Sequence, residues 1–125
     1  MIPVFDSNIV IDFLNSIPEA YSEHMSHDSR YISMITWIEV MAGIPDIQRR
    51  KTVDRFLRDD FTIIHLDDEI AELAAVARRE MSLKLPDAII FATAKHHKTL
   101  LVTRNSKDFS PKNPHIRIPY QLRKN

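Results

Sequence analysis

The chain has 125 residues, and its 17 Lys and Arg balance its 17 Asp and Glu, so the formal net charge is zero. This length, with 44% hydrophobic residues, predicts a single domain over residues 1–125 with enough apolar content to bury a core. The absence of cysteine excludes disulfides and thiolate metal sites and favours a reducing, cytoplasmic location. No apolar run approaches the ~20 residues of a membrane-spanning helix, and the start M-I-P-V-F-D lacks a secretion signal, so no membrane partner is expected.

Hydrophobic periodicity predicts strands that alternate with helices along the whole chain. In chain order the predicted elements are a strand over residues 1–5, a helix capped by Ser7 or Asn8 and ended by Pro18, a polar loop to residue 30, a strand over 31–34, a helix from Thr36 through Ala42, a helix over 49–58, a strand over 61–66, a helix capped by Asp67 or Asp68, a helix opened by Pro86, a strand over 99–103 and a last strand over 115–118.

Such alternation predicts a three-layer α/β/α sandwich with a central parallel sheet and right-handed crossovers. In sheets of this kind ligands bind beyond the carboxyl ends of the strands. Residues that directly follow strands, or that open helices at the same edge, are therefore the first candidates for a functional site.

Four acidic residues meet that condition. Asp6 follows I-P-V-F, Glu39 lies in T-W-I-E-V, Asp87 in L-P-D-A-I-I and Asp108 in T-R-N-S-K-D-F. Carboxylates brought together repel one another unless a cation lies between them. The hard cations Mg²⁺ and Mn²⁺ prefer oxygen ligands, so the four acids predict a catalytic metal site of this type.

Neutral polar side chains accompany the acids. Thr103, Asn105 and Asn8, together with Ser7, supply hydroxyl and amide groups that are suited to hold a metal-bound water or a phosphate.

Each acid also has a purely structural interpretation. Thr36 and Glu39 have the spacing of a capping box, and Asp87 follows Pro86 in a first helical turn, where a negative charge complements the helix dipole. Asp6 is placed to cap the first helix, and Asp108 is placed to form a turn. One metal site accounts for all four acids together, and this favours the site.

Other chemistries have less support. His96 and His97 close a helix, where imidazoles favour the last turn, and the six histidines show no zinc-ligand spacing. Gly43 is the only glycine, which excludes a dinucleotide fingerprint, and there is neither a P-loop nor a G-x-S-x-G nucleophile turn.

Four segments resemble the motifs of the PIN domain family, most closely those of VapC-type toxins from toxin–antitoxin pairs. D-S-N-I at residues 6–9 resembles the opening D-T/S-N/S of the family, and E-V-M-A-G at 39–43 resembles its E-L-x-x-G. L-P-D-A-I-I at 85–90 resembles its L-P-D-A block, and L-V-T-R-N-S-K-D-F at 101–109 resembles its final strand and acidic turn. The four occur in the family's order over nearly the whole chain.

The resemblance implies a Mg²⁺-dependent or Mn²⁺-dependent endoribonuclease in which Asp6, Glu39 and Asp87 bind metal. The fourth ligand stays open: many relatives carry Asp at the position of Asn105, whereas this chain has its acid at Asp108. Either Asp108 completes the site or Asn105 does so as a neutral ligand.

The resemblance also implies partners. RNA is expected as the substrate, presented as single strands or loops, with Arg104 and Lys107 holding flanking phosphates. A cognate antitoxin is expected to cover the acidic groove with Arg or Lys, and a homodimer is expected to form near Trp37 and Met41.

One other interpretation remains open at the level of sequence, and a second is disfavoured. A catalytically silent PIN domain that binds RNA or a protein is favoured by Asn105 and by the zero net charge. A receiver-type phosphoacceptor domain would place an acid at Asp67 after a strand, but Arg104 stands where that class needs Lys, and the L-P-D-A block would have no role.

Overall fold

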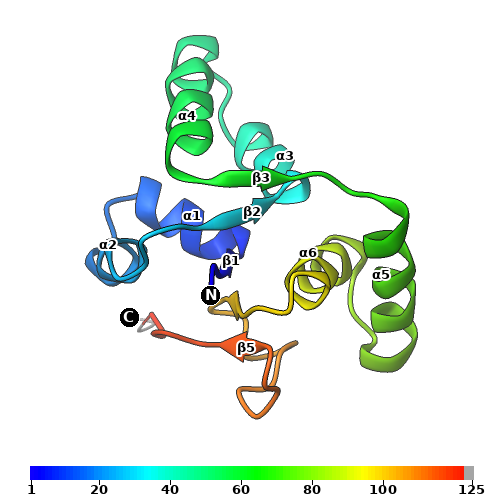
Figure 1. Ribbon diagram of the computed structural model, residues 1–125. Coiled ribbons are helices and arrows are strands. Elements are labelled where there is room, and N and C mark those ends of the chain that lie inside the picture. Colours follow the sequence, from blue (N-terminus) through cyan, green and yellow to red (C-terminus); the bar gives the residue numbers. More distant parts are fainter. Residues whose placement is uncertain (123–125) are drawn as a thin grey trace.

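The computed structural model describes residues 1–122, which form a parallel five-stranded sheet with helices on both faces (Figure 1). The strand order is β3-β2-β1-β4-β5, and all four neighbouring pairs are parallel. The strands are β1 (Val4–Phe5), β2 (Tyr31–Ser33), β3 (Thr62–Ile64), β4 (Leu101–Val102) and β5 (Ile116–Arg117). The predicted sandwich with a central parallel sheet is confirmed.

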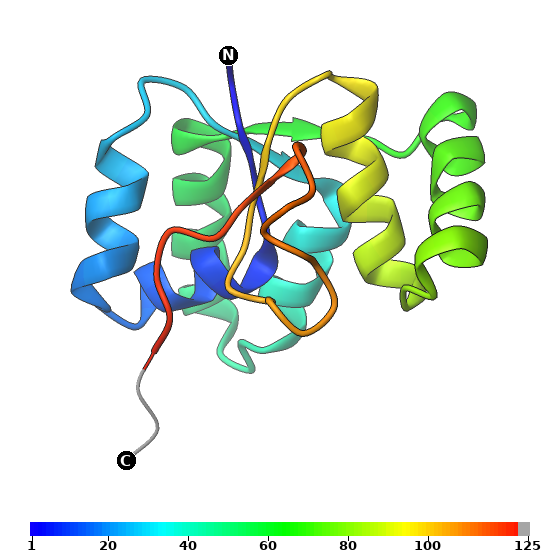
Figure 2. The same cartoon turned by 90° about the horizontal axis from the view of Figure 1, so that it is seen from below.

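The helices form two separate layers, one on each face of the sheet. Figure 2 shows α5 and α6 together on one side of the strands and α1 to α4 on the other. Their bounds are α1 (Ser7–Leu14), α2 (Pro18–Met25), α3 (Met34–Ala42), α4 (Ile47–Asp60), α5 (Asp68–Met81) and α6 (Leu85–His96).

Each layer encloses its own hydrophobic core. Adjacent strand residues alternate between the two faces, so Val4 packs toward α5 and α6, whereas Phe5 packs toward α1, α3 and α4. Leu101 and Val102 divide in the same way. Even two-residue strands therefore tie the three layers together.

The chain reverses its direction of travel across the sheet between β1 and β4. The first crossovers proceed outward from β1 to β2 and then to β3, and the next returns through α5 and α6 to β4 on the other side of β1. Val4 pairs with Tyr31 of β2 and with Leu101 of β4. Because open α/β sheets bind ligands at such a reversal, the carboxyl ends of β1 and β4 are the expected position of a site.

The sequence predictions at the starts of α1, α2 and α3 were wrong. α1 is capped by Asp6 and not by Ser7 or Asn8. Pro18 does not lead into a loop; it stands at the start of α2, where proline is favoured because its missing N–H needs no partner there. α3 does not begin at Thr36, because Ser33 caps it by accepting the amide N–H of Ile35 at 3.0 Å. The predicted cap Asp67 of α5 is confirmed, with the Ile70 amide donating to it at 2.8 Å.

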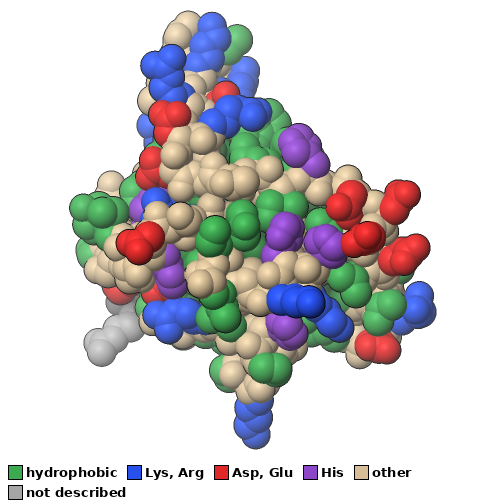
Figure 3. Space-filling model, viewed as in Figure 1, with side chains coloured by type: hydrophobic (Ala, Val, Ile, Leu, Met, Phe, Trp, Pro, Cys, Tyr) green, Lys and Arg blue, Asp and Glu red, His purple; other side chains and the backbone are tan. Residues whose placement is uncertain are grey.

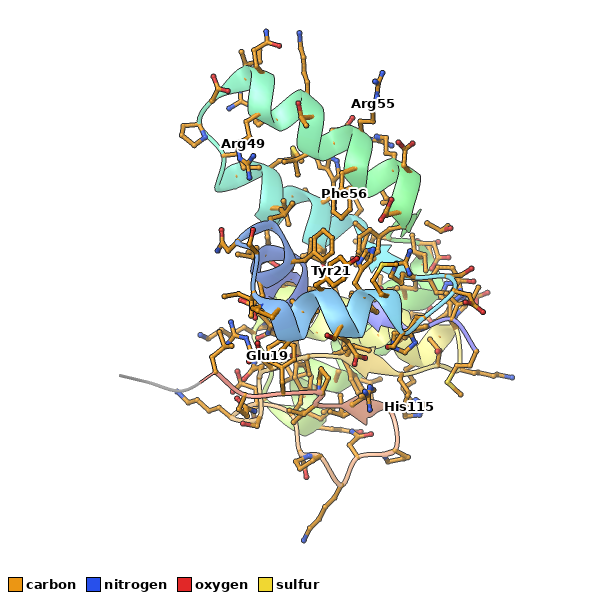
Figure 4. The ribbon with its side chains drawn as sticks, turned by 90° about the vertical axis from the view of Figure 1, so that its left-hand side faces the viewer. Glu19, Tyr21, Arg49, Arg55, Phe56 and His115 are labelled. Carbon is orange, nitrogen blue, oxygen red and sulfur yellow. The ribbon has the colours of Figure 1, made fainter. Side chains whose placement is uncertain are left out.

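An aromatic cluster holds α2 against its neighbours. The ring of Phe13 in α1 stacks between Tyr21 of α2 and Phe56 of α4, at centroid distances of 6.1 and 5.1 Å. Figure 4 shows Tyr21 and Phe56 near one another where these helices meet. The buried His24 ring tilts against Phe13 at 4.5 Å and shares a hydrogen bond with Asp60 at 2.9 Å.

Within residues 1–122, no helix combines the length and the apolar character needed to cross a membrane.

Candidate metal-binding active site

Asp6 is the most buried of the four predicted acids, with a side chain only 4% exposed at the carboxyl end of β1. It is the N-cap of α1, so its Oδ1 accepts the amide N–H of Ser7 at 2.7 Å. Its Oδ2 accepts the hydroxyl of Thr103 at 2.7 Å and, more weakly, the amide of Asn8 at 3.4 Å. The capping role predicted as an alternative is therefore real, but it uses only one of the two oxygens.

The environment of Asp6 disfavours its negative charge. Burial is the largest cause and, together with the nearby charges of Asp87 and Glu39, it raises the pKa of Asp6 from 3.8 to about 6, against the opposing hydrogen bonds from Thr103 and Ser7. Glu39 and Asp87 act on Asp6 although they lie 33 and 81 residues away from it along the chain. The fold thus brings three of the predicted carboxylates into one electrostatic cluster.

Glu39 lies in the second turn of α3, facing α1. The hydroxyl of Ser7 donates to its Oε1 at 2.7 Å, and the same hydroxyl oxygen lies 3.0 Å from that of the fully buried Thr36. The capping-box interpretation of Thr36 and Glu39 is wrong, because Ser33 caps this helix. Glu39 is held by a residue of the site instead.

Asp87 occupies the first turn of α6, as predicted. Partial burial and then the charges of Asp108 and Glu39 raise the pKa of Asp87, with Lys84 opposing them. The favourable helix-dipole position therefore does not remove the repulsion among the acids.

Asp108 and Asn105 bind each other across the turn after β4. The side-chain amide of Asn105 donates to Asp108 Oδ2 at 3.0 Å, and the backbone N–H of Asp108 returns a bond to Asn105 Oδ1 at 3.1 Å. The turn role predicted as an alternative for Asp108 is therefore present, while its charge still reaches Asp87. The two candidates for the fourth position form one unit.

Thr103 connects the parts of the site. Its hydroxyl donates to Asp6 and accepts from the Asn8 side chain at 3.2 Å and from the Asn105 backbone at 3.0 Å. One donated and two accepted bonds use the full capacity of a hydroxyl group. The predicted polar residues Thr103, Asn8 and Asn105 thus fix the orientation of Asp6.

The cations near the site differ from those expected. The guanidinium of Arg104 forms a two-point ion pair with the buried carboxylate of Asp12, with Nε–Oδ2 and Nη2–Oδ1 distances of 2.6 and 3.1 Å. The charge of Arg104 is therefore already paired. Lys84 acts on Asp87, and Arg49 lines a hollow of about 260 Å³ together with Glu39. Lys84 directly precedes the L-P-D-A block, a signal that the sequence offered; Arg49 becomes visible only in the fold.

The donor set suits a hard divalent cation. All the candidate ligands are oxygens, and a positive ion would relieve the repulsion that raises the pKa values of Asp6 and Asp87. Among residues 1–122, no three His, Asp or Glu side chains approach closely enough to hold an ion by themselves. Mg²⁺ tolerates this spacing because it retains several of its waters and needs only one or two carboxylates.

Comparison with known proteins agrees with the geometry. The sequence pattern of the PIN domain matches residues 4–111. The fold superposes on a chain of a toxin–antitoxin complex from Klebsiella pneumoniae with a TM-score of 0.87 and 40% identity, covering 96% of this chain and 99% of that one. No curated protein matches the chain in sequence.

More distant structures share the fold. VapBC2 from Rickettsia felis, bound to a DNA fragment from its promoter, has a TM-score of 0.78 and 22% identity over 94% of this chain and 98% of that one. FitAcB from Neisseria gonorrhoeae has the same TM-score and identity over 97% and 100%. The chain therefore belongs to the PIN domain family, as the four sequence motifs predicted, and its resemblance to VapC-type members is confirmed.

Proposed function

We propose that the protein is a metal-dependent endoribonuclease that hydrolyses RNA phosphodiester bonds as the toxin of a toxin–antitoxin pair. The PIN family match and the similarity to the K. pneumoniae complex support the general class, a nuclease of the toxin type. The observation that carries the proposal is the mutual repulsion of Asp6, Glu39 and Asp87 at the carboxyl edge of the sheet.

Asp6, Asp87 and either Asp108 or Asn105 would hold Mg²⁺ or Mn²⁺. Such an ion, when bound, lowers the pKa of a water ligand and neutralises charge that develops on the phosphodiester. The Ser7 hydroxyl donates a hydrogen bond of 2.7 Å to Glu39 and so holds this carboxylate beside the cluster. There Glu39 would orient the attacking water or hold a second ion. Thr103 and the Ser7 amide hold Asp6 in one orientation, so the ligand needs no rearrangement.

The RNA backbone requires cations beside the acids, because two sets of negative charges would otherwise repel. We assign this role to Lys84 and Arg49, whose positions border Asp87 and Glu39, and retain Lys107 as a predicted contact. Figure 3 shows Lys and Arg side chains gathered over α4, the helix whose first turn contains Arg49, while acidic side chains gather over α5. Although the net charge is zero, one side of the molecule is therefore basic.

An antitoxin and a second copy of the chain are the proposed protein partners. The acidic cluster is complementary to Arg or Lys offered by an antitoxin. Trp37 and Met41 line an open groove with Ile47, which is 56% exposed, and this apolar surface is where the homodimer was predicted.

Cleavage of a defined single-stranded RNA tests the proposal. Wild type is expected to cleave with Mg²⁺ and to lose activity in EDTA, and Asp87→Asn is expected to lose at least about a hundredfold in rate with Mg²⁺ present. The matched control is Asp46→Asn, an exposed helix cap outside the cluster, which should cleave like wild type.

The same assay separates the proposal from a catalytically silent domain. Cleavage that persists in EDTA and in Asp87→Asn would refute the metal site. RNA binding without any cleavage by wild type, at every Mg²⁺ and Mn²⁺ concentration, would favour the silent binding domain.

A further inference from the structure

The C-terminal segment over residues 116–122, which includes β5, lies outside the residues that match the PIN pattern, yet it contacts the candidate site through side chains. The match ends at residue 111, whereas the structure continues through β5 to residue 122. In Figure 1 this orange-to-red segment includes β5 and then passes beside α1 and α2. Two separate sets of polar contacts tie it to the rest of the molecule.

The first set centres on Asp12, a carboxylate of α1 that is only 5% exposed. Tyr120 donates its hydroxyl to Asp12 Oδ2 at 2.8 Å, and Arg104 donates to both oxygens of the same group. Burial and the adjacent Asp12 charge raise the pKa of Tyr120 well above its usual range, so its hydroxyl remains a donor. Gln121 adds bonds from Nε2 to the Arg104 carbonyl at 3.2 Å and to the Ser106 hydroxyl at 3.1 Å.

The loop 103–106 that these contacts hold is part of the site. The backbone N–H of Arg104 donates to Asn8 Oδ1 at 3.1 Å, and this bond fixes which way the Asn8 amide points. Asn8 then donates to both Asp6 and Thr103, and Thr103 donates to Asp6. Hydrogen bonds at the side chain of Arg104 and at its backbone N–H therefore connect Tyr120, through Asp12 and Asn8, with Asp6, the most buried acid of the cluster.

The second set lies on α2, and its side-chain bonds do not lead to the site. The backbone carbonyl of Arg117 accepts the amide N–H of Thr103 at 3.0 Å, a bond that substitution of the Arg117 side chain leaves in place. Arg117 forms a two-point ion pair with the buried Glu23, with Nε–Oε2 and Nη2–Oε1 distances of 2.8 Å. His27 also contacts Glu23 at 2.8 Å. This pair anchors the same C-terminal segment and provides a natural comparison.

We propose that Tyr120 and Gln121 are positioning residues that act through Arg104: they clamp the loop 103–106 and so keep Thr103 and Asn8 against Asp6. We call Tyr120, Gln121, Arg104 and Asp12 the C-terminal clamp. Its effect on metal affinity rests on the function proposed above, whereas its effect on the loop does not. Removing the clamp loosens the support of Asp6 while leaving every proposed ligand in the chain.

The test compares the double variant Tyr120→Phe/Gln121→Ala with the control Arg117→Gln. The first keeps the ring of residue 120 and removes the hydroxyl and amide donors, and the second breaks the other tie of the same segment. Mn²⁺ affinity is measured by titration calorimetry, and hydrogen exchange is measured at the amides of Arg104 and Asn105, which bond to Asn8 and Thr103. Denaturant unfolding reports how much each variant destabilises the fold.

The clamp variant is expected to bind Mn²⁺ roughly three- to tenfold more weakly than wild type. This is less than the about 10- to 100-fold typical of direct supporting partners of metal ligands, because the clamp acts on Asp6 through Arg104 and Asn8. Exchange at the two amides is expected to rise about tenfold or more in this variant. The control should change neither by more than about twofold, even where it lowers the free energy of unfolding as much.

Unchanged exchange at both amides in the clamp variant would overturn the proposal, as would equal effects of the clamp and control variants. Unchanged Mn²⁺ affinity with faster exchange would also overturn it, because the loop would then move without affecting the ligands. Wild type that binds no Mn²⁺, while the clamp variant alone shows faster exchange, would support the clamp of the loop and refute the metal-dependent function.

Discussion

Replacing Asp6 by Asn should stabilise the metal-free protein at neutral pH, although it removes the central residue of the proposed site. The carboxyl has a pKa of about 6 in the folded protein against an ordinary 3.8. At about 1.36 kcal/mol per pH unit, the folded state disfavours the charged form by about 3 kcal/mol. Asn is isosteric and uncharged, so this cost disappears in the variant.

The sign of the pH dependence follows from the raised pKa. Between about pH 4 and pH 6 the folded protein binds more protons at Asp6 than the unfolded chain does, so the free energy of unfolding of wild type falls as the pH rises through this range. The side-chain amide that replaces the carboxyl in the variant does not titrate. The free energy of unfolding of the variant, relative to that of wild type, should therefore increase by about 3 kcal/mol when the pH is raised from about 4 to about 8. At both pH values the variant loses about 1 kcal/mol because its bonds to Ser7 and Thr103 are weaker.

Urea unfolding in EDTA, followed by the fluorescence of Trp37, measures this difference at the two pH values. Asp67→Asn is the matched control, because Asp67 also caps a helix but is exposed and is not among the charges that act on Asp6. Its effect should stay within about 0.5 kcal/mol at both pH values. Parallel pH curves for wild type and Asp6→Asn would refute the account of a buried, repelled carboxylate.

Further substitutions test the surrounding structure. Glu23→Gln should cost about 1–2 kcal/mol in urea unfolding at about pH 7, because it breaks the ion pair of the buried Glu23; the cost stays modest because the Arg117 side chain is 46% exposed and its charge is screened by solvent. Burial opposes the charge of Glu23, but hydrogen bonds from Arg117 and His27 prevail and lower its pKa, so the difference from wild type should shrink as the pH falls below about 4.5. Ser33→Ala should cost about 1 kcal/mol in the same assay through loss of the α3 cap, and an unchanged midpoint would contradict that role. Lys84→Ala should weaken RNA binding and reduce the slope of log affinity against log salt by about 0.7; an unchanged slope would remove Lys84 from the backbone contacts.

Much of the fold could be predicted because its signals are local. The apolar strands, the Asp67 cap and the Pro86 start of α6 depend on neighbouring residues. α2 was missed because its buried face consists of Ala20, Glu23 and His24, which show no apolar repeat. Its inward side depends on a histidine stacked among aromatic rings and on an ion pair with a distant strand, and neither is visible in sequence.

The same distinction between local signals and contacts of distant residues applies to the candidate site. The four acids were predicted from their positions at strand and helix ends, and the structure brings Asp6, Glu39 and Asp87 into mutual repulsion. Local spacing was misleading at Glu39, whose partner is Ser7 of another helix. It was misleading again at Arg104, which pairs with Asp12 from 92 residues away. Contacts of that separation require the fold itself.

The central claim is that the acids at the carboxyl edge of the sheet form one divalent-metal site. Anomalous diffraction from crystals soaked in MnCl₂ tests it directly. We expect at least one Mn²⁺ peak coordinated by Asp6 or Asp87, and the remaining ligands would reveal whether Asp108 or Asn105 fills the fourth position. No peak within coordination distance of either carboxylate, in crystals where the cluster is open to solvent, would contradict it.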